Sequence, residues 1–273
     1  RDSMSSDAYL LGIDYGTESC RVAIFDLAGR PVTFAATPYA TKYPRSGWAE
    51  QSPADWWEAL QASSARALAN AGIPASAIAG ISYDATTMTV VPMDAKGQEL
   101  RDAIMWMDVR ATEQAARAQS SDSVARLYNG AGTAPATAEW FPFKAAWLKE
   151  NEPGLYARTY RILQSKDYLV YRLTGHMETT DMSDASHGLL MNLETRQYDT
   201  EMFHNVGVDL DKFPQIHTSC EIAGRLSEEA AGCLGLRAGI PVSVGGGDGA
   251  CANVGAGVAK PGDFYLSLGT TAW

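Results

Sequence analysis

The sequence predicts an α/β fold, a mixed β-sheet flanked by helices, and three observations lead to this class. Apolar runs at residues 9–14, 22–25 and 30–36 are short, closely spaced and separated by turn residues, which is typical of antiparallel strands. Longer Ala-rich and amphipathic stretches then alternate with short apolar runs, which favours parallel strands joined by crossing helices. A strand followed by a Gly-Thr turn also occurs near both ends of the chain, which indicates a duplicated architecture.

The first Gly-Thr turn joins two predicted strands, and its residues suit phosphate binding. Gly16 lets a phosphate approach the main chain closely, and the hydroxyls of Thr17 and Ser19 add hydrogen-bond donors. Asp14, at the end of the strand, is placed to hold Mg²⁺ directly or through water, and Arg21 suits a two-pronged contact with phosphate. From this segment alone, an ordinary hairpin whose polar side chains satisfy the turn is the alternative.

A second turn of the same kind lies at residues 264–272. It repeats an apolar strand, a Gly-Thr step and further hydroxyls, and its predicted phosphate-binding residues are Gly269, Thr270 and Thr271. Two such turns, far apart in the chain, predict two hairpins that grip the phosphates of one ligand.

Composition excludes several classes of function. The formal net charge of −10 argues against a nucleic-acid surface, which needs clustered Lys and Arg. No apolar run reaches the roughly 18 residues that a membrane span requires. The four cysteines are scattered without metal-ligand spacing, which predicts reduced thiols in a cytoplasmic protein and no structural zinc.

The first long helix and the strand after it lead to candidate substrate ligands. The helix is predicted to begin after its N-cap Ser52 and to end at Gly72, and a buried strand follows at residues 78–83. Ligands bind at the carboxyl ends of strands in α/β sheets, so Asp84 and Thr86 suit the hydroxyl groups of a polyol. A capping cluster without a ligand is an equally supported alternative.

Residues 104–111 run from a strand into a helix predicted over residues 112–127. Trp106 offers an apolar face to the C–H groups of a sugar, and Asp108 is able to accept two hydroxyl hydrogen bonds. Arg110 is expected to orient Asp108 rather than to touch the substrate. An exposed N-cap Asp beside a core Trp is the alternative.

A buried strand near residue 242 ends in three glycines and Asp248, and a helix of small residues follows. A general base must lie within reach of the hydroxyl whose proton it takes up. Glycines let substrate approach a carboxylate at such a strand-to-helix break, so Asp248 is the predicted general base. The alternative is a glycine-rich turn with an N-cap Asp.

Together these segments resemble the FGGY carbohydrate kinases, which belong to the actin/Hsp70/hexokinase-like ATPase superfamily. The resemblance covers residues 9–273 and rests on the following motifs: Asp-x-Gly-Thr-x-Ser-x-Arg at 14–21, Trp-x-Asp-x-Arg-Ala at 106–111, Lys-x-x-Trp-Leu-x-Glu-Asn at 144–151 and Gly-Gly-Gly-Asp-x-Ala at 245–250. Ala145 departs from the large apolar residue that is usual there. The resemblance implies a ribonuclease H-like sheet, ATP and Mg²⁺ as cofactors, and a catalytic role for Asp248.

The resemblance also suggests a substrate. Asp-Ala-Thr at residues 84–86 is similar to the ribulokinases, whereas xylulokinases usually show a Met-His-Gly segment. It therefore implies transfer of the γ-phosphoryl group of ATP to ribulose, with xylulose, a tetrulose or another polyol as alternatives. A non-catalytic ATPase-fold module used for binding is the alternative from a different class.

The family pattern predicts three regions. Residues 1–8 are expected to be a disordered remnant, 9–262 the sugar-binding N-terminal domain, and 263–273 the start of an ATP-binding C-terminal domain. We expect the partners to be a small sugar and ATP, without nucleic acid or membrane. The surface that would contact the second domain is expected to be exposed in this chain, and two copies of the chain could associate through it as a homodimer.

Overall fold

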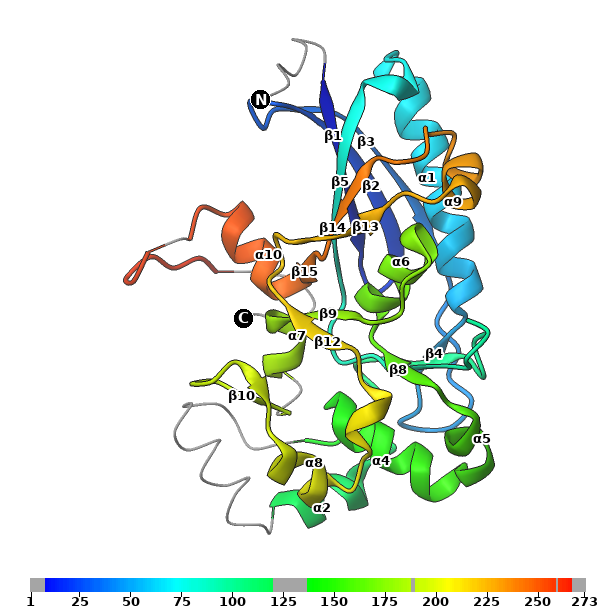
Figure 1. Cartoon of the computed structure of the whole chain (residues 1–273), viewed down its shortest axis with the longest axis vertical. Helices are drawn as coiled ribbons and strands as arrows, with labels where there is room; N and C mark the ends of the chain where they lie inside the picture. The colour runs from blue at the N-terminus through cyan, green and yellow to red at the C-terminus, as the bar shows by residue number, and fades with distance from the viewer. Residues whose placement is uncertain (1–7, 120–136, 188–189, 259, 267–273) are drawn as a thin grey trace.

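The computed structural model describes residues 8–119, 137–187, 190–258 and 260–266. Figure 1 shows an elongated molecule, with a β-sheet and its covering helices in the upper part and a group of short helices in the lower part. The predicted residues 269–271 and the end of the helix predicted over 112–127 lie outside the described residues, as do residues 1–7.

Seven strands form the main sheet within the described ranges: β1 (Tyr9–Tyr15), β2 (Ser19–Asp26), β3 (Pro31–Pro38), β5 (Ile78–Ala85), β13 (Ile222–Arg225), β14 (Pro241–Ser243) and β15 (Gly246–Gly247). Their order is β13-β14-β5-β1-β2-β3, and β15 continues alongside β5 after β14. The β1–β2, β2–β3 and β13–β14 pairs are antiparallel, whereas β5 runs parallel to β1, β14 and β15. The predicted mixed sheet, with three antiparallel strands followed by parallel ones, is confirmed.

Short strand pairs connect the sheet to the rest of the chain: β4 (Glu50–Gln51) with β7 (Ala103–Ile104), β6 (Val91–Met93) with β8 (Arg161–Leu163), β9 (Thr179–Asp181) with β12 (Gln215–His217), and β10 (Met191–Asn192) with β11 (Gln197–Tyr198). The helices of the described residues are α1 (Pro53–Ala71), α2 (Thr112–Gln119), α4 (Phe141–Asn151), α5 (Pro153–Arg158), α6 (Ser165–Thr174), α7 (Met182–His187), α8 (Thr200–Val206), α9 (Glu228–Leu234) and α10 (Asp248–Gly255). Two 3₁₀ turns lie at Ala75–Ala77 and Leu210–Lys212.

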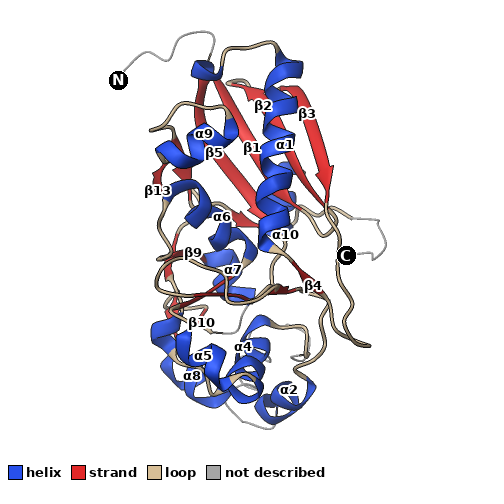
Figure 2. Cartoon of the chain, turned by 90° about the vertical axis from the view of Figure 1, so that its right-hand side faces the viewer, coloured by secondary structure: helices blue, strands red, loops and turns tan. Residues whose placement is uncertain are grey.

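Helix α1 has the boundaries that its sequence predicts. Ser52 is the N-cap in an extended conformation, although its side chain makes no capping hydrogen bond, and proline occupies the first helical position. Gly72 ends the helix in the left-handed conformation, with φ of 63°, and its N–H donates to the Leu68 carbonyl. Figure 2 shows α1 lying across one face of the sheet.

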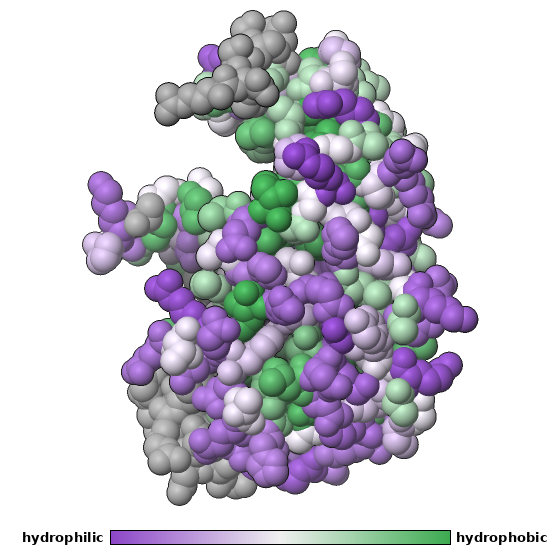
Figure 3. Space-filling model, viewed as in Figure 1, coloured by the Kyte–Doolittle hydropathy of each residue, from purple (hydrophilic) through white to green (hydrophobic). Residues whose placement is uncertain are grey.

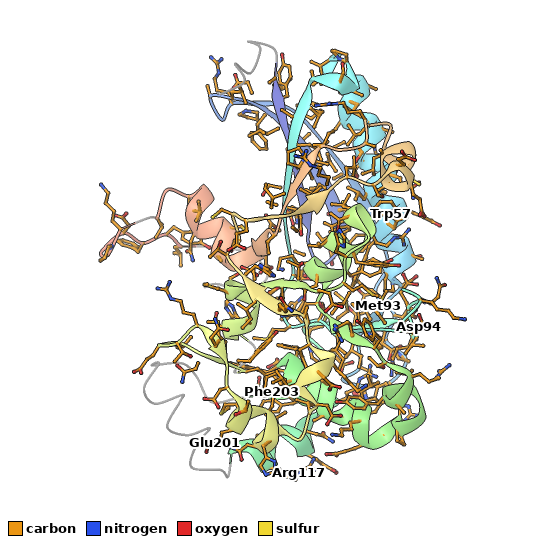
Figure 4. The ribbon with its side chains drawn as sticks, in the orientation of Figure 1. Trp57, Met93, Asp94, Arg117, Glu201 and Phe203 are labelled. Carbon is orange, nitrogen blue, oxygen red and sulfur yellow. The ribbon has the colours of Figure 1, made fainter. Side chains whose placement is uncertain are left out.

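The core divides into two clusters of buried side chains. One lies between the sheet and helices α1, α6 and α9, and it includes Trp57; the other joins α2, α4 and α8 in the lower part, and it includes Phe203. Figure 4 shows these two side chains far apart along the length of the molecule. Met93, on β6, belongs to the first cluster and lies near the middle of the view, where the two parts meet.

The alternation of side chains along β1 decides which face of the sheet is open to a ligand. Leu11, Ile13 and Tyr15 are buried in the cluster that contains α1. Successive residues of a strand point to opposite faces, so Gly12 and Asp14 face away from α1. None of the helices in the described ranges has the length and apolar character needed to cross a membrane.

Candidate active site

Three carboxylates meet at the carboxyl-terminal edge of the sheet. Asp14 of β1 lies in register with Asp84 of β5 on one side and with Arg21 of β2 on the other. Gly246 of β15 pairs with Asp84 from the opposite flank of β5, and Asp248 follows two residues later as the first residue of α10. The sheet therefore brings together residues that are more than 230 positions apart in the sequence.

The charges of this cluster are strongly coupled. Arg21 Nη1 lies 2.8 Å from Asp14 Oδ2, and the Asp14 and Asp84 side chains are hydrogen-bonded to each other. Burial, and after it the nearby Asp14 and Asp248 carboxylates, raise the pKa of Asp84 to about 8. Burial also raises the pKa of Asp14 and of Asp248. The pair therefore disfavours two adjacent negative charges, an effect that a bound cation would offset.

The Gly-Thr turn is tightly closed around Arg21. Gly16 donates its N–H to the Ser19 carbonyl, and a Cβ at position 16 would lie 2.5 Å from Arg21 Nη2. A side chain at position 16 would therefore displace the end of the Arg21 side chain from the turn. Thr17, which is partly exposed, accepts a 3.0 Å hydrogen bond from Trp106 Nε1. This contact joins the predicted phosphate turn to the predicted sugar-contacting ring.

Trp106 is 36% exposed, as a ring that receives a ligand needs to be. Lys144 of α4 binds the main chain of this segment. Its Nζ donates to the Met105 carbonyl at 2.8 Å and to the Trp106 carbonyl at 3.4 Å. Lys144 is fully buried, and burial lowers its pKa to about 7. The Lys of the predicted family motif thus supports the loop that carries the ring.

The structure contradicts the prediction that Asp108 binds sugar hydroxyls, because the Asp108 carboxylate is fully buried and not available to a sugar. Arg110 donates to Asp108 Oδ1 from Nε at 2.9 Å and to Oδ2 from Nη2 at 2.7 Å, and the Ala49 N–H also donates to Oδ2 at 2.7 Å. The Arg110 guanidinium in turn lies 3.7 Å from the centroid of the Trp48 ring and binds Glu50. Asp108 therefore fastens the 48–50 segment to the Trp106 loop.

Thr86 is the second correction, since the structure buries it and partly exposes Thr87 instead. Strand β5 extends to Ala85, two residues beyond the predicted apolar run, and the Thr86 N–H donates to the Tyr15 carbonyl. Ser165 Oγ donates to the Thr86 carbonyl at 2.5 Å. Thr87 lies beside Gly247, where an added Cβ would come within 2.5 Å of its Cγ2.

Met88 was not identified from the sequence. It has a positive φ of 63°, which is costly for a side chain of this size, and its N–H donates to Gln164 Oε1 at 2.7 Å. Strained backbone of this kind clusters at ligand sites. The sequence does show a polar Thr-Thr-Met segment after the strand. It does not show at which residue the strand ends, so the strained position could not be assigned to Met88.

The glycines before Asp248 allow two close backbone contacts. Gly245 has φ of +72°, and a Cβ there would lie 2.5 Å from the Tyr83 carbonyl oxygen. At Gly247 the added atom would meet both Thr87 and, at 3.2 Å, Asp184 Oδ1. The strand can reach the edge of β5 and turn into α10 only because these positions lack side chains.

A groove of about 430 Å³ runs along the sheet face opposite α1. Asp14, Arg21 and Asp84 line its polar end, and Phe25 and Phe34 line its apolar part. Figure 3 shows apolar surface in the upper half of the molecule, next to the arm that carries α10. Within the described part of the chain, no three His, Cys, Asp or Glu side chains are grouped as a complete metal site.

This sheet topology, with acids gathered at the carboxyl edge beside a Gly-Thr hairpin, defines an actin/hexokinase-like ATPase fold. The model of the FGGY family of carbohydrate kinases, N-terminal domain, matches residues 9–255, and the chain belongs to this family. Xylulose kinase of Staphylococcus xylosus is 30% identical over 97% of the chain and 54% of its own length. Glycerol kinase 2 of Streptomyces avermitilis is 31% identical over 89% of the chain and 48% of its own length.

A solved structure agrees with these matches. The crystal structure of xylulose kinase from Rhodospirillum rubrum superimposes with a TM-score of 0.90 at 26% identity, over 97% of the chain and 54% of that structure. The chain thus spans about half the length of the relatives it matches.

Proposed function

We propose that the full-length protein is an ATP-dependent kinase that phosphorylates a hydroxyl group of a ketopentose. The observation that carries this proposal is the register of the sheet edge, which sets Asp14 beside Asp84 and places Asp248 on the other flank of β5. Membership of the FGGY family and relatives named xylulose kinase and glycerol kinase support the same reaction class.

Asp248 is the proposed general base. Its Oδ1 accepts the Gly249 N–H at 2.7 Å, and we assign Oδ2 to the proton of the attacking hydroxyl. Burial raises its pKa, which makes it a better proton acceptor than a free carboxylate.

The Gly-Thr hairpin is the proposed phosphate and metal side of the site. Gly16, Thr17, Ser19 and Arg21 would bind phosphate oxygens. Mg²⁺ fits this donor set, because it binds through one or two carboxylates and completes its shell with water and phosphate oxygens. We assign it to Asp14, where it would neutralise phosphate charge. A role for residues 269–271 at the second turn stays a prediction.

The sugar side is formed by Trp106, Asp84 and the partly exposed Thr87. The ring would pack against sugar C–H groups, and the two polar side chains would bind hydroxyls. We propose ribulose as the preferred ketopentose, because Asp84 and Ala85 stand where xylulokinases usually have a different segment. Relatives named xylulose kinase make xylulose the second candidate.

A kinase assay on the full-length protein tests the reaction, with ribulose, xylulose, glycerol and a tetrulose as acceptors. We expect ATP-dependent phosphorylation of a ketopentose, and a loss of about 10²–10⁴-fold in kcat for Asp248→Asn, because an amide cannot take up the proton. Turnover by Asp248→Asn within a few-fold of the wild type would contradict the assignment.

Ligand-dependent melting separates a kinase from a non-catalytic binding module. A sugar site stabilises the chain by RT ln(1 + [L]/Kd), so millimolar ketopentose should raise the melting temperature of the 273-residue chain itself. Absence of both a melting shift and phosphorylation for every sugar tested would favour the binding module.

A further inference from the structure

A buried polar network lies directly behind the turn that carries Asp248. At its centre is Asp181, the last residue of β9, whose side chain is fully buried. Its Oδ2 accepts hydrogen bonds from the Ser183 hydroxyl at 2.7 Å, the Ser183 N–H at 2.9 Å and the Ser219 hydroxyl at 2.7 Å. The Ser183 hydroxyl oxygen in turn accepts the Gly247 N–H at 2.8 Å. A continuous chain of hydrogen bonds therefore runs from Asp181 to the N–H of Gly247, the residue before Asp248.

The direction of these hydrogen bonds is fixed by the chemistry of the groups. An ionised carboxylate only accepts, so the single proton of the Ser183 hydroxyl is committed to Asp181. The hydroxyl oxygen is then free to accept from Gly247, and a backbone N–H can only donate. Neither hydrogen bond can be reversed, because an ionised carboxylate has no proton to donate and a backbone N–H cannot accept one.

Lys166 provides the charge that keeps Asp181 ionised. Its ammonium group is fully buried, 2.8 Å from Asp167 Oδ1, 3.5 Å from Asp181 Oδ1 and 3.7 Å from Asp184 Oδ2. Lys166 and the Ser183 and Ser219 hydroxyls hold the pKa of Asp181 below its usual value despite burial, whereas burial raises the pKa of Asp167 and Asp184. Of the three acids, Asp181 is thus the one whose ionised form its surroundings favour.

Gly247 pairs with Ala85 at the end of β5, and its N–H donates to the Ser183 hydroxyl. It is the N-cap of α10, so its N–H lies outside the hydrogen bonds of that helix. The pairing of β15 with β5 is limited to two residues, Gly246 opposite Asp84 and Gly247 opposite Ala85, and positions 245–247 are all glycine. A run of three glycines has little conformational preference of its own, so the contact with Ser183 restricts the peptide that precedes Asp248.

We propose that Asp181 and Ser183 are positioning residues that orient the Asp248 carboxylate through the Gly247 peptide. The proposal rests on the proposed function, since it assigns Asp248 as the base. In this role neither Asp181 nor Ser183 needs to touch the substrate.

Ser183→Ala in the full-length kinase is the test. It removes the acceptor for Gly247 and leaves the buried charges intact. We expect kcat to fall roughly 10- to 100-fold, the range expected when a catalytic group is misplaced by up to about 1 Å, while the KM for the sugar changes by less than about threefold. Ser183→Thr keeps a hydroxyl and should recover most of the activity. Ser186→Ala is the matched control, because its hydroxyl lies on the same helix but donates only to the Ser183 carbonyl.

Asp181→Asn should reproduce the loss of kcat if it folds, and Ser183→Ala decides the question if it does not. A kcat for Ser183→Ala within twofold of the wild type would overturn the proposal, as would equal losses in Ser183→Ala and Ser186→Ala. Asp248→Asn is assayed in parallel. If that variant is inactive while Ser183→Ala is normal, only the positioning role fails; if Asp248→Asn is active, the proposed base itself is wrong.

Discussion

Replacing Asp108 by Asn should destabilise the protein without changing its affinity for sugar. Asp108 and Arg110 are both fully buried, and the substitution removes the charge opposite the guanidinium. Breaking a buried ion pair from one side costs about 3–5 kcal/mol. Glu50 also accepts from Arg110 Nη2, at 2.7 Å, so the guanidinium keeps one anionic partner and we expect a loss of about 3 kcal/mol. That is a large part of the roughly 5–15 kcal/mol that stabilises a typical protein.

Chemical and thermal unfolding of the 273-residue chain measure this loss. At about 2–4 °C per kcal/mol for a chain of this size, the melting temperature should fall by roughly 6–12 °C. Asp102→Asn is the matched control, because its partner Lys42 is 55% exposed and a surface ion pair contributes at most about 1 kcal/mol. Equal stability of the two variants, together with at least tenfold weaker ketose binding by Asp108→Asn, would refute the structural role and restore Asp108 as a sugar ligand.

Three further predictions concern other parts of the site. Lys144 has a pKa lowered by burial from 10.5 to about 7, so the folded state binds fewer protons than the unfolded state between these values. The free energy of unfolding of the wild type, relative to that of Lys144→Met, should therefore rise with pH between about 7 and 10.5, by up to about 1.4 kcal/mol per pH unit. Denaturant titrations at several pH values measure this difference. A difference that does not change with pH would contradict the prediction. Gly245→Ala should lower the melting temperature more than Gly239→Ala, because both positions have positive φ but only Gly245 has a carbonyl oxygen 2.5 Å from the added atom. Calorimetric titration should show Trp106→Ala binding ketose roughly tenfold more weakly, a loss of about 1.4 kcal/mol, whereas Trp106→Phe, which loses only the hydrogen bond to Thr17, should lose less.

Local patterns predicted most of the fold. The strands that form β1 to β3 follow from short apolar runs with turn residues between them, and the boundaries of α1 follow from Ser52 and Gly72. These features depend on residues close together in sequence.

The errors arose where distant residues decide the environment. Nothing near Asp108 in sequence shows that the Ala49 N–H, 59 positions away, occupies one of its oxygens. The choice between Thr86 and Thr87 depends on how far β5 continues, and that length is set by its pairing with β1 and β15. A slip of one residue at a strand end exchanges the buried side chain for the exposed one. The role of Asp181 was likewise hidden, since Gly247 lies 66 positions away.

In the proposed site, the hydrogen bond from Trp106 Nε1 to Thr17 Oγ1 would make one hydroxyl common to phosphate binding and sugar binding. A phosphate that engages Thr17 competes for, or reorients, the group that holds the ring, and a sugar that packs on the ring restrains the hydroxyl in return. Energetic coupling between two ligands is reciprocal, so each ligand must alter the affinity for the other by the same factor. With these proposed roles, the affinity of the site for the sugar would depend on whether the phosphate is bound, and the converse.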